Sequence, residues 1–152
     1  MGLIVRSSLI HAAGVYTTAF IPKGTHVVEY EGPRISYDAA EALYDDRDIT
    51  YLYGLSDGKT CINGTGIAAF INHSCDPNCE SDELNGRVFI IALRDIEPGE
   101  ELCYDYCLFD GSPDDPSYCH CGAKTCRGSM YEDEEIERLK KLGMVVREPV
   151  AQ

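Results

Sequence analysis

Short alternations of apolar and polar residues run through most of this chain, and they predict strands. Residues 3–35 alternate in this way and carry turn signals rich in glycine and proline. Further strands are expected at Val27–Tyr30, at Tyr51–Leu55, around Cys61 and Ile62, at Val88–Leu93 and at Glu101–Tyr106. Many short strands with little helix between them predict a mostly β domain.

Two segments break the alternation and predict helices. Residues 36–50 form a short helical insert, because Ser36 can cap a helix whose first turn holds Asp38. Residues 131–141 are acidic first and basic later, as the helix dipole prefers, and Gly143 can end that helix. The intervening residues 108–118 contain Gly and Pro and are predicted to be a loop.

Length and hydropathy limit the classes of protein to which this chain can belong. A chain of 152 residues is expected to form one domain with a true core. Its apolar runs, such as Val88–Leu93, are too short to span a membrane, and Met1–Arg6 lacks a secretory pattern. We therefore expect an intracellular protein without a membrane partner, cytoplasmic in a prokaryote or nuclear in a eukaryotic or viral setting. The sequence carries no sign of its oligomeric state.

The charge of the chain indicates its kind of partner. The net charge is −13, from 26 acidic and 13 basic residues. Such a surface repels phosphate backbones, so direct binding of nucleic acid is not expected. It would attract a basic protein segment instead, although the same acidity also keeps a protein soluble.

Eight cysteines in a chain without a secretory signal favour metal ligation over disulfides. Cys119 and Cys121 lie two residues apart, so an extended chain turns both thiols to one side, and Cys126 can return to the same ion across a Gly-containing turn. A structural zinc site needs four ligands. The fourth could be Cys75, Cys79, Cys103, Cys107 or His120, and spacing alone does not choose. Buried reduced thiols are the alternative.

Two polar groups of residues are candidates for a ligand site. Asn72 and His73 follow an apolar run, where such side chains are most often hydrogen-bonded structural residues. Tyr104 and Tyr106 are expected on one face of a strand, with Asp105 opposite, an arrangement that usually serves packing. Neither group is specific when taken by itself.

Taken in order, however, these segments closely resemble SET-domain protein-lysine methyltransferases with a post-SET zinc motif. The resemblance rests on residues 70–78 (FINHSCDPN), 99–106 (GEELCYDY) and 119–128 (CHCGAKTCRG), with similar opening and middle motifs at 14–15, 21–32 and 51–55. It covers residues 3–131. It implies a SET fold of several small β-sheets with a pseudoknot-like C-terminal region, the short helical insert and a zinc-bound post-SET lobe. The implied divisions are a SET domain at 1–108, a post-SET segment at 109–131, and a C-terminal helix and tail at 132–152.

The resemblance implies transfer of a methyl group from S-adenosylmethionine to a lysine amine. A free lysine has a pKa near ~10.4 and is no nucleophile at neutral pH. Desolvation in a narrow channel beside the cofactor's sulfonium should lower that pKa, and the channel would align the amine with the methyl group. The acidic composition fits a basic substrate segment, such as one of a histone-like, ribosomal or nucleoid protein. The implied cofactors are S-adenosylmethionine and a structural Zn²⁺.

The resemblance also assigns roles to residues. Tyr106 matches the family's catalytic tyrosine, and Tyr104 matches the position that sets how many methyl groups are added, here favouring monomethylation. Tyr51 matches a tyrosine that lines the cofactor and lysine sites, while Asn72 and His73 match the pair that holds the cofactor. The zinc ligands would be Cys75, Cys119, Cys121 and Cys126. The adenine would pack against Met130 or Tyr131.

Several positions depart from the family pattern. Ala12-Ala13-Gly14 stands where Gly-x-Gly is usual in the cofactor loop, Ala69 replaces an Arg, and Ile62-Asn63-Gly64 replaces Ile-Asp-Ala. These departures favour a rival hypothesis, a degenerate SET fold that binds a lysine-bearing peptide without catalysis. The intact tyrosine and Asn-His positions favour the enzyme. A purely structural zinc module would leave the tyrosine strand unexplained.

Overall fold

The computed structural model of the protein describes residues 2–44 and 51–146. Its strands and helices follow one another as β1 (Leu3–Ser7), β2 (Ala13–Thr17), β3 (His26–Glu29), β4 (Arg34–Ser36), α1 (Tyr37–Tyr44), β5 (Leu52–Gly54), β6 (Thr60–Asn63), the 3₁₀ helix η1 (Ile67–Phe70), β7 (Asn72–His73), β8 (Cys79–Leu84), β9 (Arg87–Ala92), β10 (Glu101–Tyr104) and α2 (Asp133–Lys141).

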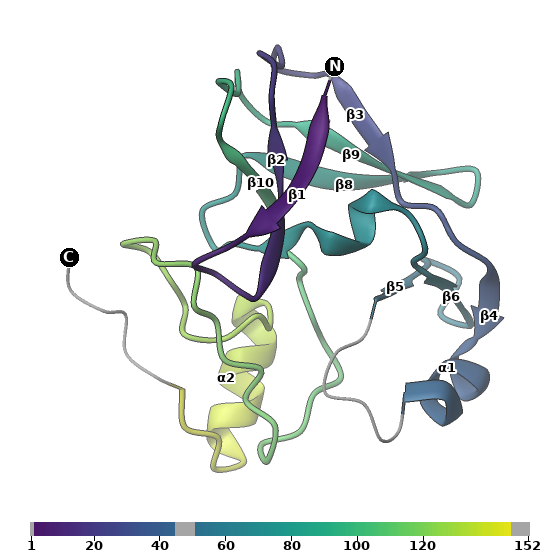
Figure 1. The fold of residues 1–152 in the computed structure, drawn as a ribbon. Helices are drawn as coiled ribbons and strands as arrows, with labels where there is room; N and C mark the ends of the chain where they lie inside the picture. Colours follow the sequence, from purple (N-terminus) through teal and green to yellow (C-terminus); the bar gives the residue numbers. More distant parts are fainter. Residues whose placement is uncertain (1, 45–50, 147–152) are drawn as a thin grey trace.

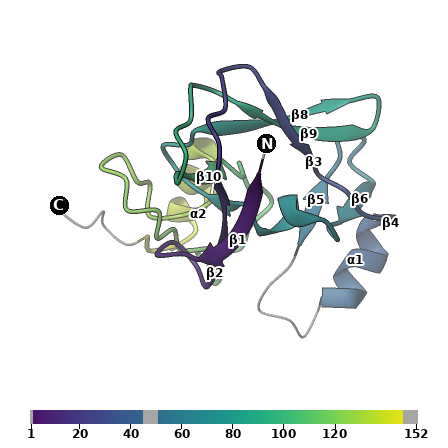
Figure 2. The same ribbon diagram turned by 45° about the horizontal axis from the view of Figure 1, so that its top comes forward.

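The strands form a seven-stranded and a three-stranded sheet (Figure 1). The larger sheet runs β1-β2-β10-β8-β9-β3, with β7 also beside β10, and the smaller one runs β4-β6-β5. Figures 1 and 2 place the small sheet and α1 on one side of the molecule. Helix α2 lies on the other side with residues 109–132, which we call the C-terminal segment. The mostly β fold class predicted from the alternation is confirmed.

Strand β10 is the central element of the larger sheet. It pairs antiparallel with β2 and parallel with β7 and β8. The register with β7 sets Cys103 opposite Asn72 and Tyr104 opposite His73. The two candidate polar groups of the sequence therefore lie side by side, although about thirty residues separate them along the chain.

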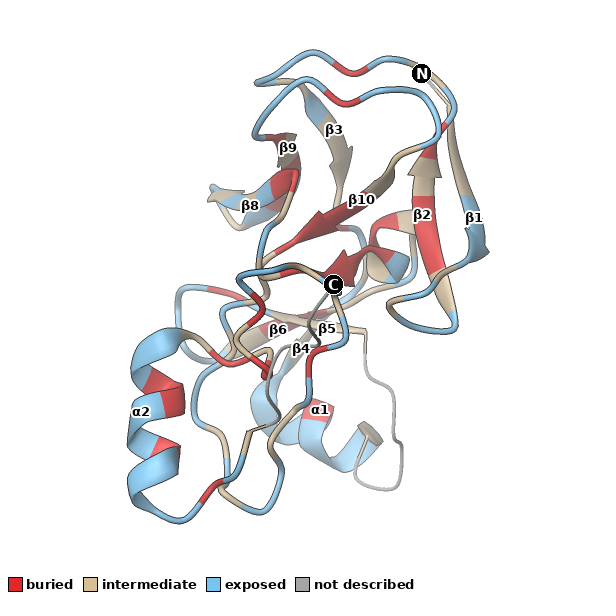
Figure 3. Cartoon of the chain, turned by 90° about the vertical axis from the view of Figure 1, so that its left-hand side faces the viewer, coloured by how far each residue is buried: buried red, intermediate tan, exposed pale blue. Residues whose placement is uncertain are grey.

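The main core lies between the two sheets and η1. Its largest fully buried side chains are aliphatic and include Val15, Ile21, Ile62, Ile71, Ile90, Ile96 and Leu102. Figure 3 shows the resulting run of buried positions through β2 and β10. A second cluster of Tyr131, Ile136, Leu139 and Met144 fixes α2, and Leu108 packs against it.

Most predicted elements are present with shifted ends. Ser36 caps α1 by accepting a hydrogen bond from the Ala39 amide at 3.1 Å, and the rest of the predicted insert, 45–50, lies outside the described residues. Helix α2 begins at Asp133 instead of residue 131, because Glu132 is extended at the N-cap and Tyr131 forms a β-bridge with Leu108. Gly143 follows the helix with a φ of 101°, as expected for its end. None of the helices in the described part has the length and apolar character that crossing a membrane requires.

Candidate active site and metal centre

Two cavities meet near the end of β10. The first, of about 570 Å³, is bounded by the β1–β2 loop, β7 and the C-terminal segment. The second, of about 940 Å³, is bounded by α1, β5 and the segment after β10. Four residues line both cavities, namely Leu52, Ala69, Tyr106 and Leu108. We call them the shared wall. A group bound in one cavity is therefore separated from the other by a single layer of side chains.

Tyr106 is the polar residue of the shared wall. Its hydroxyl donates a hydrogen bond to the Ile71 carbonyl, and its backbone N–H donates to His73 Nδ1 at 3.0 Å. The Tyr104 ring lies 4.8 Å from the Tyr106 ring and lines only the second cavity. Burial raises the pKa of both tyrosines above the usual range. Both phenols stay protonated at neutral pH, so they orient a ligand better than they remove a proton from it.

Three further tyrosines, Tyr30, Tyr37 and Tyr53, line the second cavity and were missed in the sequence. The Tyr53 hydroxyl shares a hydrogen bond of 2.7 Å with Ser81 Oγ, and the Tyr30 hydroxyl donates to the Tyr51 carbonyl at 2.6 Å. Their rings lie 5.4 Å apart. The pattern Tyr51-x-Tyr53 was the available signal for Tyr53, whereas Tyr30 reaches the site only through tertiary packing. Together with Tyr104 and Tyr106, they give the cavity an aromatic wall with polar tips.

Strand β7 directs Asn72 toward the cofactor loop predicted at Ala12-Ala13-Gly14. Asn72 Nδ2 donates to the Ala13 carbonyl at 2.8 Å and to Glu101 Oε1 at 2.9 Å. A Cβ on Gly14 would come within 2.1 Å of that carboxylate oxygen. A side chain at position 14 would therefore have to displace the end of the Glu101 side chain. The departure from Gly-x-Gly keeps a glycine at this position.

The four cysteines assigned to zinc come together. Each offers a sulfur, and all four sulfur atoms lie within 4.8 Å of one another, with 3.7 Å between Cys75 and Cys119. Tetrahedral thiolates at ~2.3 Å from zinc would be about 3.8 Å apart, so the cluster fits the ion. Of the other thiols considered, Cys79 and Cys103 are buried in the sheet and Cys107 is exposed.

The electrostatics of the cluster favour a thiolate. The hydrogen bond with the Cys119 thiol lowers the pKa of Cys75 against the opposing effect of burial. Contacts from His73 Nε2 at 3.4 Å and from the Arg127 backbone N–H at 3.4 Å lower it further. A thiolate is the form of cysteine that binds zinc.

His73 joins this cluster to Tyr106. Its Nδ1 accepts the Tyr106 backbone hydrogen bond, so the ring proton of the neutral form lies on Nε2, facing Cys75. The 3.6 Å separation between Nδ1 and Asp105 is too long for a hydrogen bond. One imidazole therefore contacts both the candidate zinc site and the backbone of the shared wall.

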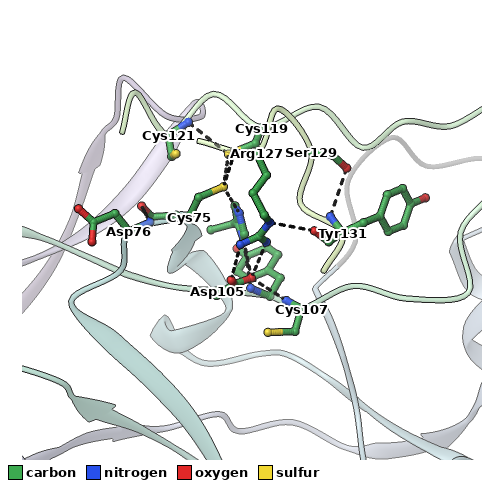
Figure 4. A network of polar contacts seen from close by, with 12 residues as sticks. Cys75, Asp76, Asp105, Cys107, Cys119, Cys121, Arg127, Ser129 and Tyr131 are labelled. Atoms are coloured by element: carbon green, nitrogen blue, oxygen red, sulfur yellow. Dashed lines mark hydrogen bonds and ion pairs between the residues drawn. The ribbon is translucent and has the colours of Figure 1, made fainter. Parts of the chain in front are cut away.

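A second connection runs through Arg127 (Figure 4). Its guanidinium donates two hydrogen bonds to Asp105, at 2.7 and 3.0 Å, and a third to the Tyr131 carbonyl at 3.1 Å. Burial alone would raise the pKa of Asp105, but the hydrogen bonds from Arg127 and from the Cys107 amide outweigh it and lower that pKa. The paired ions hold the C-terminal segment against the end of β10.

Comparison with known proteins identifies the fold family. A family model described as a SET domain matches residues 12–107. The chain belongs to the SET-domain family. It is 41% identical over 137 residues to the H3 lysine-4 specific histone-lysine N-methyltransferase of Saccharomyces cerevisiae, covering 81% of this chain and 12% of that protein. It is 40% identical over 132 residues to the histone-lysine N-methyltransferase trithorax of Drosophila virilis, covering 79% of this chain and 3% of that protein. The chain thus matches a small part of each of these longer proteins.

The residues assigned by the SET resemblance divide between the two cavities. The first cavity is lined by Ala12, Ala13, Tyr51, Asn72, His73, Tyr106 and Met130. Gly14 is buried and does not line it, and Tyr131 also lies outside it, which leaves Met130 as the candidate for adenine packing. His120, one of the possible fourth zinc ligands, lines the first cavity and is not part of the cysteine cluster. Tyr104 lines the second cavity.

Proposed function

We propose that this SET domain transfers a methyl group from S-adenosylmethionine to a lysine side chain of a basic protein. The observation that carries the proposal is the meeting of two cavities at a shared wall that holds Tyr106. Methyl transfer needs a donor and an acceptor that approach from opposite sides along one line. Two cavities separated by one layer of side chains suit that geometry.

The first cavity suits the cofactor, and the second suits the lysine side chain. In the first, Asn72 and His73 would hold the amino-acid and adenosine parts of the cofactor, with Met130 against adenine. S-adenosylmethionine bound there would supply an electrophilic methyl group for the lysine nitrogen. In the second, the aromatic wall would enclose the lysine stem. Tyr106 would orient the amine with its hydroxyl, and desolvation would favour the neutral amine.

The second cavity also indicates the class of substrate. Its rim includes Glu41 and Asp110, and the whole chain carries a net charge of −13. A basic segment complements such a surface. Because the similar proteins are named as histone-lysine methyltransferases, a histone-like tail is the first substrate to test.

We further propose that Cys75, Cys119, Cys121 and Cys126 bind a structural Zn²⁺. A closed four-cysteine site leaves no position open for a substrate, so the ion would serve stability. Its place beside His73 would also support the first cavity.

The direct test is transfer of a labelled methyl group to protein. Zinc-replete protein is incubated with labelled S-adenosylmethionine and a panel of histones, ribosomal proteins and nucleoid proteins, with an acidic protein as the control. We expect label on lysine in a basic protein, and cofactor binding by calorimetry. The rival hypothesis, a degenerate SET fold, predicts peptide binding without cofactor binding. Absence of cofactor binding in zinc-replete protein would reject the enzyme.

The number of methyl groups added should depend on Tyr104. Its ring is buried against Tyr106, so its hydroxyl would crowd a lysine amine that already carries a methyl group. We expect the native protein to stop at monomethyl-lysine and Tyr104→Phe to produce dimethyl-lysine as well. Mass spectrometry of a single-lysine peptide measures this. An unchanged product distribution at comparable turnover would contradict the assignment.

A further inference from the structure

Glu101 carries a carboxylate that contacts Asn72 beside the first cavity. It is the first residue of β10, and its side chain accepts hydrogen bonds from three side chains. Ser8 Oγ lies 2.8 and 2.9 Å from its two oxygens, Asn72 Nδ2 lies 2.9 Å from Oε1, and the Tyr16 hydroxyl lies 3.3 Å from Oε2. Within the described residues it forms no ion pair. Its negative charge is therefore not neutralised by a neighbouring side chain.

The contact with Glu101 determines which way the Asn72 amide points. The two closest partners of Nδ2 are the Glu101 carboxylate and the Ala13 carbonyl, at 2.9 and 2.8 Å. An ionised carboxylate and a carbonyl can only accept hydrogen bonds, so the NH₂ group must face them. Asn72 lines the first cavity, and the opposite end of its amide, Oδ1, is the end that these two contacts leave available to a ligand there. An oxygen in that position accepts a hydrogen bond from a ligand N–H.

The backbone at Gly14 lies close to the Glu101 carboxylate. A Cβ on Gly14 would lie 2.1 Å from Glu101 Oε1 and 3.1 Å from Asn72 Nδ2. Ser8 and Ala13 stand on either side of the β1–β2 turn, and both are hydrogen-bonded into the same cluster. Glu101 thus connects the cofactor loop to β7 before any ligand arrives, which is the preorganisation that a binding site needs.

We propose that Glu101 is a positioning residue for the cofactor. It holds Asn72 with its amide oxygen toward the first cavity, where that oxygen receives the ammonium of the cofactor's amino-acid part. The unneutralised charge of Glu101 attracts the same ammonium. This inference rests on the proposed function, because it assumes that the cavity binds S-adenosylmethionine.

The test compares two ligands that differ in the amino-acid part. S-adenosylhomocysteine carries the ammonium, whereas 5′-methylthioadenosine has the adenosine and thioether without it. Dissociation constants of both are measured by calorimetry for the native protein, Glu101→Ala, Glu101→Gln and the control Glu100→Ala. Glu100 loses the same charge, but its carboxylate pairs with Arg94 at 2.9 Å and does not contact Asn72.

For Glu101→Ala we expect S-adenosylhomocysteine to bind at least about tenfold more weakly, the usual effect of losing a charged hydrogen bond. Binding of 5′-methylthioadenosine should be unchanged. Glu101→Gln should fall between the native protein and Glu101→Ala, because its amide oxygen can still accept from Asn72 while the charge is gone. It also serves as the test if the alanine variant fails to fold. Glu100→Ala should bind both ligands as the native protein does.

The outcomes separate this inference from the proposed function. Equal weakening of both ligands, or no weakening of either in a folded Glu101 variant, would overturn the role of Glu101. Failure of the native protein to bind S-adenosylhomocysteine would instead overturn the proposed function and, with it, the premise of this inference.

Discussion

Replacing Tyr106 with Phe is expected to reduce methyl transfer at least about 100-fold, the usual effect of a small misplacement of reacting groups. The substitution removes the hydroxyl of the shared wall and its hydrogen bond to the Ile71 carbonyl. The aromatic ring, which packs against Tyr104 and His73, would remain. We therefore expect the turnover number to fall while the dissociation constant of the cofactor changes little. Steady-state kinetics with a lysine peptide, together with calorimetry, measure the two quantities.

A matched control is Tyr131→Phe. Tyr131 is also buried, and its hydroxyl also donates to a backbone carbonyl, that of Asp115, at 2.9 Å. It lines neither cavity. Its loss should lower stability by about 1 kcal/mol without a comparable loss of turnover. Equal turnover in native protein and Tyr106→Phe would show that the lysine is oriented by other groups.

Loss of the metal is expected to have the other large effect, a loss of stability in the segment at 109–131. Replacing Cys75 or Cys121 with Ser removes one of four thiolates, and structural zinc sites contribute apparent free energies of about 10–16 kcal/mol in small domains. The segment at 109–131 contributes little to the aliphatic core, so zinc and the Arg127–Asp105 pair would be its main attachments. We expect loss of the bound zinc, and faster proteolysis of this segment.

The same variants should also bind the cofactor more weakly. The C-terminal segment supplies Cys119, His120 and Met130 to the first cavity, and His73 contacts Cys75 directly. Elemental analysis and calorimetry with S-adenosylhomocysteine measure zinc and ligand in one sample. Cys107→Ser is the control, because Cys107 is exposed and outside the cluster. One full equivalent of zinc in both ligand variants would reject the ligand set. Zinc loss with unchanged ligand binding would reject the connection through His73.

Local patterns predicted the elements well where one face of a strand is buried. Strand β9 alternates buried and less buried residues, and its apolar run was recognised. Strand β8 was missed, because three of the six residues of Cys79–Leu84 are acidic and its strand conformation depends on pairing with β9 and β10. Pairing energy comes from neighbours that a single segment does not contain.

The candidate site, like the fold, could be predicted from the sequence only in part. Residues within recognisable motifs, such as Asn72 and Tyr106, could be predicted for a ligand site, and both line the first cavity. The contacts that support them join distant parts of the chain, as Glu101 joins Ser8 and Arg127 joins Asp105. No spacing rule predicts such contacts, because they depend on how β10 is placed between β2 and β7.

The position of β10 between β2 and β7 also has a consequence for how the protein folds. Leu102 pairs with Val15, and the first cavity needs both Ala12 and Met130, so its walls come from opposite ends of the chain. Contacts between such distant residues close large loops before they gain stabilising energy, which slows folding. During synthesis, the ligand-binding site cannot be complete until residue 130 has left the ribosome. Partial chains would carry exposed strand edges and depend on chaperones longer than a locally folded domain would.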